Sequence, residues 1–146
     1  MKSARRRARE YAVQGFYQWQ LAGTAVGDIE RTLAEDEHFA DADADYFAQL
    51  LRGTLQDIGA LEQQLSTALD RKPEELSPIE RAILLLATYE FVHAPEIPYR
   101  VVINEAIELA KTFGGTDGHK YVNGVLDKLA PALRPHEKSG SRKHQG

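Results

Sequence analysis

A chain of 146 residues, 42% of them hydrophobic and 27% charged, has the size and composition of one ordinary globular domain. It contains no cysteine, which excludes disulfides and cysteine-bound zinc or iron–sulfur centres. No apolar run of about 18 residues occurs, and the basic N-terminus does not lead into an apolar stretch. Neither a membrane span nor a secretory signal is therefore predicted.

The net charge of −4 conceals a strong internal asymmetry. The first nine residues carry five positive charges and no acid, and the last thirteen carry a net charge of +3. The residues between them must therefore sum to −12. An acidic body between two basic ends says little about the fold, but it predicts partners that are themselves strongly charged.

Apolar residues recur with the helical period of about 3.6 from the start of the chain. The pattern predicts a first helix over residues 4–19, followed by glycines at 23 and 27. Basic residues form one face of its first turns: Lys2, Arg5, Arg6 and Arg9. Asp28 is expected to cap a second, shorter helix.

A long third helix is predicted over residues 47–69, after an acidic stretch. Gly53 and Gly59 lie inside it, and each costs about 1 kcal/mol relative to alanine, so we expect the helix to bend. Pro73 ends it.

Ser77, Pro78 and Glu80 form the sequence pattern of a capping box at the start of the next helix. Residues 82–87 of that helix are apolar on every side, which is typical of a central helix wrapped by others.

Two further helices are predicted before the end of the chain. The first spans residues 101–113, and Thr116 or Asp117 caps the second, which runs until prolines at 131 and 135 close the ordered region. No convincing strand appears. The prediction is an all-α fold, a single compact domain of six or seven helices over residues 1–134, followed by a basic, disordered tail over residues 135–146.

Catalytic signatures are missing from the sequence: there is no G-x-S-x-G, H-E-x-x-H or G-x-G-x-x-G. The glycine-rich segment 114–120 fails the phosphate-loop pattern and is interpreted as a turn between helices. Asp41, Asp43 and Asp45 match the start of a calcium loop, but Tyr46 stands where glycine is needed, so favourable acids at a helix start are the preferred interpretation. We expect no enzyme activity, catalytic residue, cofactor or metal site.

The arginines near the N-terminus point to a phosphate-binding function, because guanidinium groups hold phosphate oxygens in a fork and release condensed counterions. The alternative is a solubilising helix end, frayed by four like charges at the positive pole of its dipole. Tyr121 lies beside the apolar stripe of the last helix, where its ring is either a platform for an unpaired base or part of the core. Lys111 lies away from the apolar side of its own helix.

Four segments resemble the bacterial NusB family, in the same order and over a chain of similar length. They are Arg5-Arg6-Arg7-Ala8-Arg9-Glu10, Tyr17-Gln18-Trp19-Gln20, residues 103–111 (INEAIELAK) and residues 120–128 (KYVNGVLDK). The resemblance runs from Met1 to about Pro135.

This resemblance implies a cytoplasmic transcription antitermination factor that is not an enzyme. Such a factor binds the single-stranded boxA element of ribosomal RNA leader transcripts together with the ribosomal protein NusE. It helps RNA polymerase, with other Nus factors, to read through terminators in ribosomal RNA operons. Some members form homodimers, and the sequence leaves the oligomeric state of this chain open.

The resemblance also implies site residues. Those expected to contact RNA are Lys2, Arg5, Arg6, Arg7, Lys111, Asp117, Lys120 and Tyr121. Those expected to meet NusE are Tyr17, Glu74 and Glu80. As an acid, Asp117 must accept from a base or sugar if it touches RNA; otherwise it is a helix cap. A −12 body would attract a basic ribosomal protein, while RNA would be directed to the basic end.

Two other functions compete with this one. The chain could be an accessory domain for an RNA-modifying enzyme such as a methyltransferase, or for ribosome maturation, supplied with a separate catalytic chain. It could also be a purely protein-binding helical adaptor whose arginines only solubilise one end.

Overall fold

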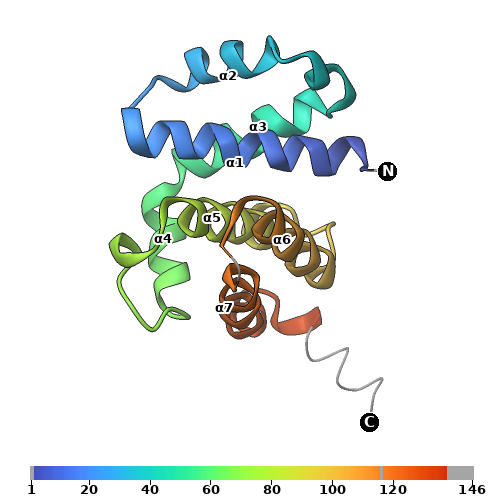
Figure 1. The fold of residues 1–146 in the computed structure, drawn as a ribbon. Helices are drawn as coiled ribbons and strands as arrows, with labels where there is room; N and C mark the ends of the chain where they lie inside the picture. The colour runs from blue at the N-terminus through green and yellow to red at the C-terminus, as the bar shows by residue number, and fades with distance from the viewer. Residues whose placement is uncertain (1, 116, 138–146) are drawn as a thin grey trace. The chain divides into compact units, whose positions relative to one another are not determined.

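The computed structural model describes residues 2–115 and 117–137. These residues form seven α-helices and two short 3₁₀ helices, with no strand among them (Figure 1). In chain order the elements are α1 (Ala4–Ala22), α2 (Val26–Ala34), η1 (Glu37–Asp41), α3 (Ala44–Gln56), α4 (Ile58–Ser66), η2 (Pro73–Glu75), α5 (Pro78–His93), α6 (Tyr99–Phe113) and α7 (Gly118–Leu133). The predicted all-α class is confirmed. None of these helices has the length and hydrophobicity needed to cross a membrane.

The chain divides into two compact units, Met1–Ile58 and Gly59–Gly146, an organisation that the hydrophobic pattern did not predict. The division falls where the expected long third helix is interrupted. Asp57, with φ −110° and ψ 19°, separates α3 from α4, and Gly53 and Gly59 lie on either side of it. The predicted bend is therefore a break between two helices.

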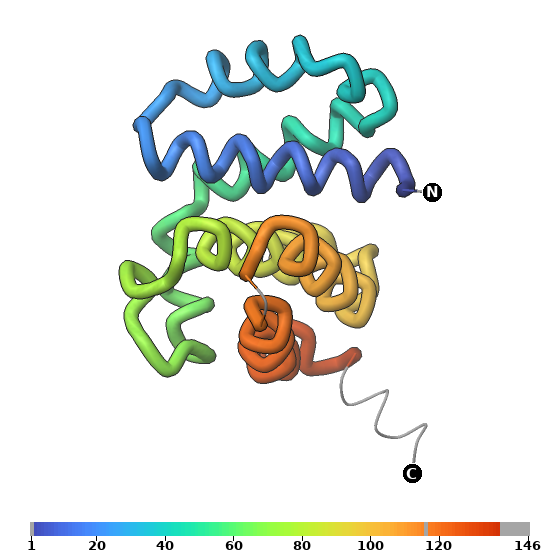
Figure 2. Tube along the Cα trace, in the orientation of Figure 1, coloured from blue at the N-terminus to red at the C-terminus, as the bar shows by residue number. Residues whose placement is uncertain are grey.

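The first unit is built on α1, which packs against α2 and α3. The chain reverses between α1 and α2 (Figure 2), and Gly23 permits this turn with a φ of +63°. Gly15 allows close helix packing, because a Cβ atom there would lie 3.0 Å from Leu51 and 3.1 Å from Ile29.

Asp28 does not cap α2, so that prediction was wrong. The helix begins three residues earlier, after Ala25, and Asp28 lies in its first turn, paired with Arg31. An acid in the first turn still favours the helix dipole, which explains why the sequence signal was misplaced by about one turn. By contrast, Asp43 caps α3 by accepting from the Tyr46 main-chain N–H at 3.0 Å, in agreement with the rejection of a calcium loop.

The second unit is built around α5, against which α6 and α7 pack. The capping box is confirmed: Ser77 Oγ accepts from the Glu80 N–H at 3.1 Å, and Glu80 Oε1 accepts from the Ser77 N–H at 3.4 Å. Every residue from Ala82 to Phe91 is buried, as the apolar run predicts. The glycine-rich segment after residue 113 connects α6 to α7, as expected.

Arg134 closes the C-terminal end of α5. Its guanidinium is 7% exposed and pairs with Glu137. It also donates to four main-chain carbonyl oxygens at 2.8–3.1 Å, those of Glu90, Phe91, Ala94 and Ile97. Glu137 in turn accepts from the Tyr99 N–H at 3.2 Å, at the start of α6. The short segment after α7 thereby joins the end of α5 to the beginning of α6.

Pro131 lies inside α7 and does not end it. Residues 135–137 are helical, so the ordered structure continues past the proline expected to close it. The predicted tail otherwise lies at 138–146, outside the described residues. The domain limit at residue 134 stays a prediction.

Candidate nucleic-acid interface

The basic N-terminal segment (residues 2–9) comprises Lys2, the cap residue Ser3 and the first six residues of α1. Ser3 caps the helix by accepting from the Arg6 N–H at 3.0 Å. The Ala4 carbonyl accepts from the Asp43 N–H at 3.0 Å, which ties this turn to the start of α3. The expected fraying is not what the structure shows: the helix begins at Ala4.

Side chains of the basic segment differ in their surroundings. Arg5 places its guanidinium 4.1 Å from the centroid of the Tyr46 ring, a cation–π contact. Lys2 is half exposed and forms an ion pair with Glu10 at 2.7 Å. Arg6 and Arg7 are partly exposed. The charges of these four residues lie at or near the surface of the first unit.

Arg9 does not belong to the exposed basic face on which the helical pattern placed it. It is only 4% exposed, and its guanidinium lies 5.5 Å from the Tyr46 ring centroid. A buried arginine contributes its aliphatic stem to packing, so its presence in the arginine run overstated the exposed charge.

The remaining predicted RNA contacts lie in the second unit, at the end of α6 and the start of α7. Lys111 is exposed in the last turn of α6. Lys120 is exposed in the first turn of α7 and forms an ion pair with Asp117 at 3.4 Å. Asp117 stands at the cap position of α7, but its side chain makes no capping hydrogen bond. The side-chain cap offered as the alternative for Asp117 is therefore absent, and its carboxylate is directed to Lys120 instead.

Tyr121 is held by two residues that lie fifty positions earlier in the chain. Its hydroxyl donates to Asp70 Oδ1 at 3.2 Å, and the Arg71 guanidinium lies 4.5 Å from its ring centroid. Arg71 Nε also donates to Asp70 Oδ1 at 2.8 Å. Sequence reasoning missed both residues, because no local pattern connects the loop after α4 with α7.

The electrostatics of this trio fit its geometry. Burial raises the pKa of Tyr121, Arg71 opposes that rise, and the hydrogen bond to Asp70 adds to it. The hydrogen bond from Arg71 lowers the pKa of Asp70, helped by the one from Tyr121. At neutral pH the tyrosine is therefore a neutral donor between a carboxylate and a guanidinium.

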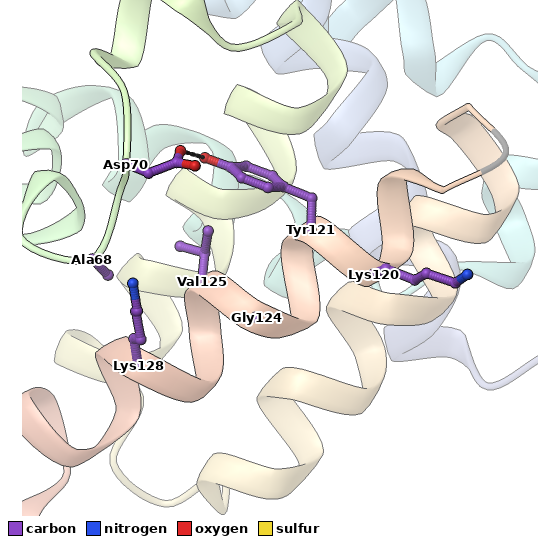
Figure 3. Close-up of a pocket in the computed structure, with 7 residues that line it drawn as sticks. All are labelled: Ala68, Asp70, Lys120, Tyr121, Gly124, Val125 and Lys128. Atoms are coloured by element: carbon purple, nitrogen blue, oxygen red, sulfur yellow. Dashed lines mark hydrogen bonds between the residues drawn. The ribbon is translucent and has the colours of Figure 1, made fainter.

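A pocket of about 250 Å³ opens beside Tyr121. Its lining comes from the loop after α4 and from α7: Ala68, Asp70, Lys120, Tyr121, Gly124, Val125 and Lys128. Figure 3 shows the tyrosine reaching from α7 toward Asp70, above Val125. The Lys128 side chain points toward Ala68, whereas Lys120 points away from Asp70.

Tyr17 is exposed, with 37% of its surface accessible, and not part of the core. Leu21 follows one turn later on α1 and is 60% exposed. Side chains four residues apart share a helix face, so the two form an apolar strip. Leu21 was missed, although its position outside the buried stripe of α1 was a usable signal.

The other predicted partner contacts lie in the second unit. Glu74 is exposed in η2. Glu80 keeps its role in the capping box, and its second carboxylate oxygen lies 3.9 Å from the position that a Cβ atom on Gly118 would take. Glu80 therefore borders Gly118, the first residue of α7.

Among the described residues no group of three or more histidine or acidic side chains could hold a metal ion. The fold and the exposed cations on α1, α6 and α7 define an all-helical protein with surfaces suited to a polyanion.

Comparison with known proteins identifies the family. A model of the NusB family matches residues 6–131. A transcription antitermination protein NusB from Azoarcus sp. (strain BH72) is 58% identical over 142 residues, which is 97% of this chain and 92% of that protein. The chain belongs to the NusB family of transcription antitermination proteins, which confirms the resemblance. Membership of this family agrees with the expectation that the protein is not an enzyme.

Solved structures share the fold. T. maritima NusB is 31% identical, with a TM-score of 0.78, over 89% of this chain and 92% of that one. A crystal structure of the antitermination factors NusB and NusE in complex with dsRNA has a TM-score of 0.79 over 87% of this chain and 96% of that one. Its sequence identity is 24%, so this second likeness concerns the fold alone.

Proposed function

We propose that this protein acts in transcription antitermination by binding single-stranded boxA RNA of ribosomal RNA leader transcripts together with the ribosomal protein NusE. In this role it promotes read-through by RNA polymerase in ribosomal RNA operons. The observation that carries the proposal is the 58% identity, across nearly the whole chain, to a protein named for transcription antitermination.

The exposed cations support the RNA-binding part of the proposal. Lys2, Arg5, Arg6 and Arg7 provide charge in one unit, and Lys111 and Lys120 provide it in the other. Charged groups of this kind neutralise phosphates and do not distinguish sequences. Tyr121 adds a ring on which a base can stack. Asp117 is the one predicted contact that must accept hydrogen bonds or act through Lys120.

An exposed apolar strip, exposed Glu74 and partly exposed Glu80 support NusE as the partner. Tyr17 and Leu21 offer apolar surface, and Glu74 and Glu80 offer carboxylates that a basic ribosomal protein would attract. The solved complex of NusB and NusE with dsRNA, which has the same fold, is consistent with such a pairing.

The same proposal includes the wider assembly. Other Nus factors and RNA polymerase complete the antitermination complex, and action on a nascent transcript implies a cytoplasmic location. A homodimer is the alternative assembly for the free protein, and sedimentation at several concentrations distinguishes it from a monomer.

The test is a fluorescence anisotropy titration of a labelled boxA RNA, with and without NusE, at two salt concentrations. We expect binding that tightens with NusE and weakens as salt rises, with a slope of about 0.7 per phosphate contact on a single strand. A scrambled RNA of equal length is the control for sequence specificity.

A triple variant tests the basic segment. Replacing Arg5, Arg6 and Arg7 with alanine should weaken binding to boxA and scrambled RNA alike, and should reduce the salt slope by roughly two units. NusE binding without RNA should stay unchanged. Unaltered RNA affinity in this variant would contradict the role of the basic segment.

A further inference from the structure

The pocket beside Tyr121 has the size and lining for one small flat ligand. Its volume of about 250 Å³ lies below the range of about 300–1,000 Å³ usual for drug-sized ligands. Val125 and Ala68 provide apolar walls, and Gly124 leaves the α7 side of the pocket open. A single nucleobase matches this combination of apolar walls and polar rim better than a larger molecule does.

Only part of the Tyr121 ring is available to such a ligand. Arg71 lies 4.5 Å from the ring centroid, too close to admit a base between the two groups, and it is not among the residues that line the pocket. The ring itself does line the pocket, so the pocket meets a part of Tyr121 that Arg71 leaves uncovered. A base inside would stack on this open part.

Asp70 fixes the ring in this position. It accepts from the Tyr121 hydroxyl at 3.2 Å and from Arg71 Nε at 2.8 Å, so one carboxylate oxygen holds both partners. A ring tied at its hydroxyl and covered on one side has little freedom left, which lowers the ordering cost of stacking. Asp70 and Arg71 are therefore positioning residues for Tyr121.

The charge at the mouth of the pocket suits the phosphate that accompanies a base. Lys128 points toward Ala68 at the pocket edge (Figure 3) and forms no ion pair within the described part of the chain. Lys120 lies on the other side and is engaged by Asp117. Lys128 is thus the lysine of the pocket that is open to a new anionic partner.

We infer that this pocket receives one unstacked base of the bound RNA, which stacks on the part of Tyr121 left open by Arg71 while Lys128 contacts the adjoining phosphate. This inference rests on the proposed RNA-binding function. It adds Asp70, Arg71 and Lys128 to the residues on which RNA binding depends.

Gly124 offers a direct test, because a Cβ atom there would meet nothing within 4 Å. A Gly124→Leu side chain therefore starts from open space at the pocket lining and should narrow the pocket, and removing a helical glycine favours α7. Loss of one stacked base should lower boxA affinity by roughly 5- to 150-fold. Gly124→Ala leaves most of the pocket open and should change affinity less than twofold.

Gly59→Leu is the matched control for adding a leucine elsewhere. Gly59 is exposed in α4, also with nothing within 4 Å of a Cβ atom, and it does not line the pocket. Thermal unfolding of all three variants verifies that each one folds. RNA carrying 2-aminopurine at one position at a time should show quenching at a single position, and Gly124→Leu should abolish it.

The outcomes separate the two proposals. If the unaltered protein does not bind boxA RNA, with or without NusE, both the proposed function and the pocket inference are overturned. If it binds and Gly124→Leu binds equally well, only the pocket inference is overturned.

Lys128→Ala should reduce the salt slope by about 0.7, and an unchanged slope counts against the phosphate contact.

Discussion

Replacing Arg134 should destabilise the protein far more than its place at the end of the last helix suggests. The guanidinium is 7% exposed and donates to four carbonyl oxygens at 2.8–3.1 Å. Two of these oxygens, those of Glu90 and Phe91, lie in the last turn of α5. Carbonyl oxygens at the end of a helix lack the N–H donors that the next helical turn would supply. A cation at this end also complements the helix dipole.

The magnitude follows from these bonds. A hydrogen bond to a charged group contributes about 1.5–3 kcal/mol net, but the four bonds share one charge whose burial costs several kcal/mol, so they do not add. Removing one side of a buried charged network costs about 3–5 kcal/mol. We expect a loss of this size for Arg134→Met, which keeps the aliphatic stem but removes the side-chain donor from all four carbonyl oxygens. Those of Glu90 and Ala94 keep a main-chain donor, and within the described residues those of Phe91 and Ile97 do not. Arg134→Lys keeps the charge without the planar fork, so its stability should lie between that of Arg134→Met and that of the unaltered protein.

Urea unfolding followed by circular dichroism measures this loss from the shift in midpoint at constant slope. Arg31→Met is the control, because Arg31 pairs with Asp28 and the two side chains are 73% and 57% exposed. Surface pairs of this kind contribute about 0–1 kcal/mol. A loss below about 1 kcal/mol in Arg134→Met would refute the reasoning that these bonds hold the end of α5.

Three further predictions concern stability. Burial and a hydrogen bond to Asp36 raise the pKa of Tyr11 to about 12 from 10.0; the folded state therefore keeps a proton that the unfolded chain loses. This contribution, at most about 3 kcal/mol, is complete below pH 10 and disappears between about pH 10 and 12. Tyr11→Phe should therefore show a smaller alkaline loss in urea midpoints than the unaltered protein. Ser77→Ala removes the cap of α5 and should cost about 1 kcal/mol in the same assay, with Ser77→Thr restoring most of it. Gly23→Ala places a Cβ atom at a φ of +63° and should lower the melting temperature by an amount equivalent to about 1–2 kcal/mol, whereas alanine at exposed Gly59, inside α4, should not.

Local signals predicted the helices well where one short pattern decides the outcome. The capping box at Ser77 and the apolar run after it define α5 without help from the rest of the chain. Asp28 was misplaced because an acid stabilises a helix start either as cap or in the first turn, and sequence alone does not distinguish these positions. The break at Asp57 coincides with the boundary between two compact units, which the continuous leucine pattern does not reveal.

The candidate site was predictable only in part, because some of its contacts join distant parts of the chain. Exposed cations such as Lys111 and Lys120 follow from helical periodicity and family resemblance. The environment of Tyr121 does not, because Asp70 and Arg71 lie fifty residues away in a loop without a regular pattern. Arg9 and Arg134 are counted as surface charge in a sequence, yet both are buried, so charge arithmetic overestimates what a polyanion can meet.

The attachment of the basic segment to α3 has a thermodynamic consequence. With Ser3 capping the turn, Ala4 bonded to Asp43 and Arg5 stacked on Tyr46, this part of the chain is helical before any RNA arrives. Its docking on RNA would then lack the large negative heat-capacity change that accompanies coupled folding and binding. The enthalpy of the interaction should accordingly vary little with temperature, and ionic strength rather than temperature would dominate the response of this segment to cellular conditions.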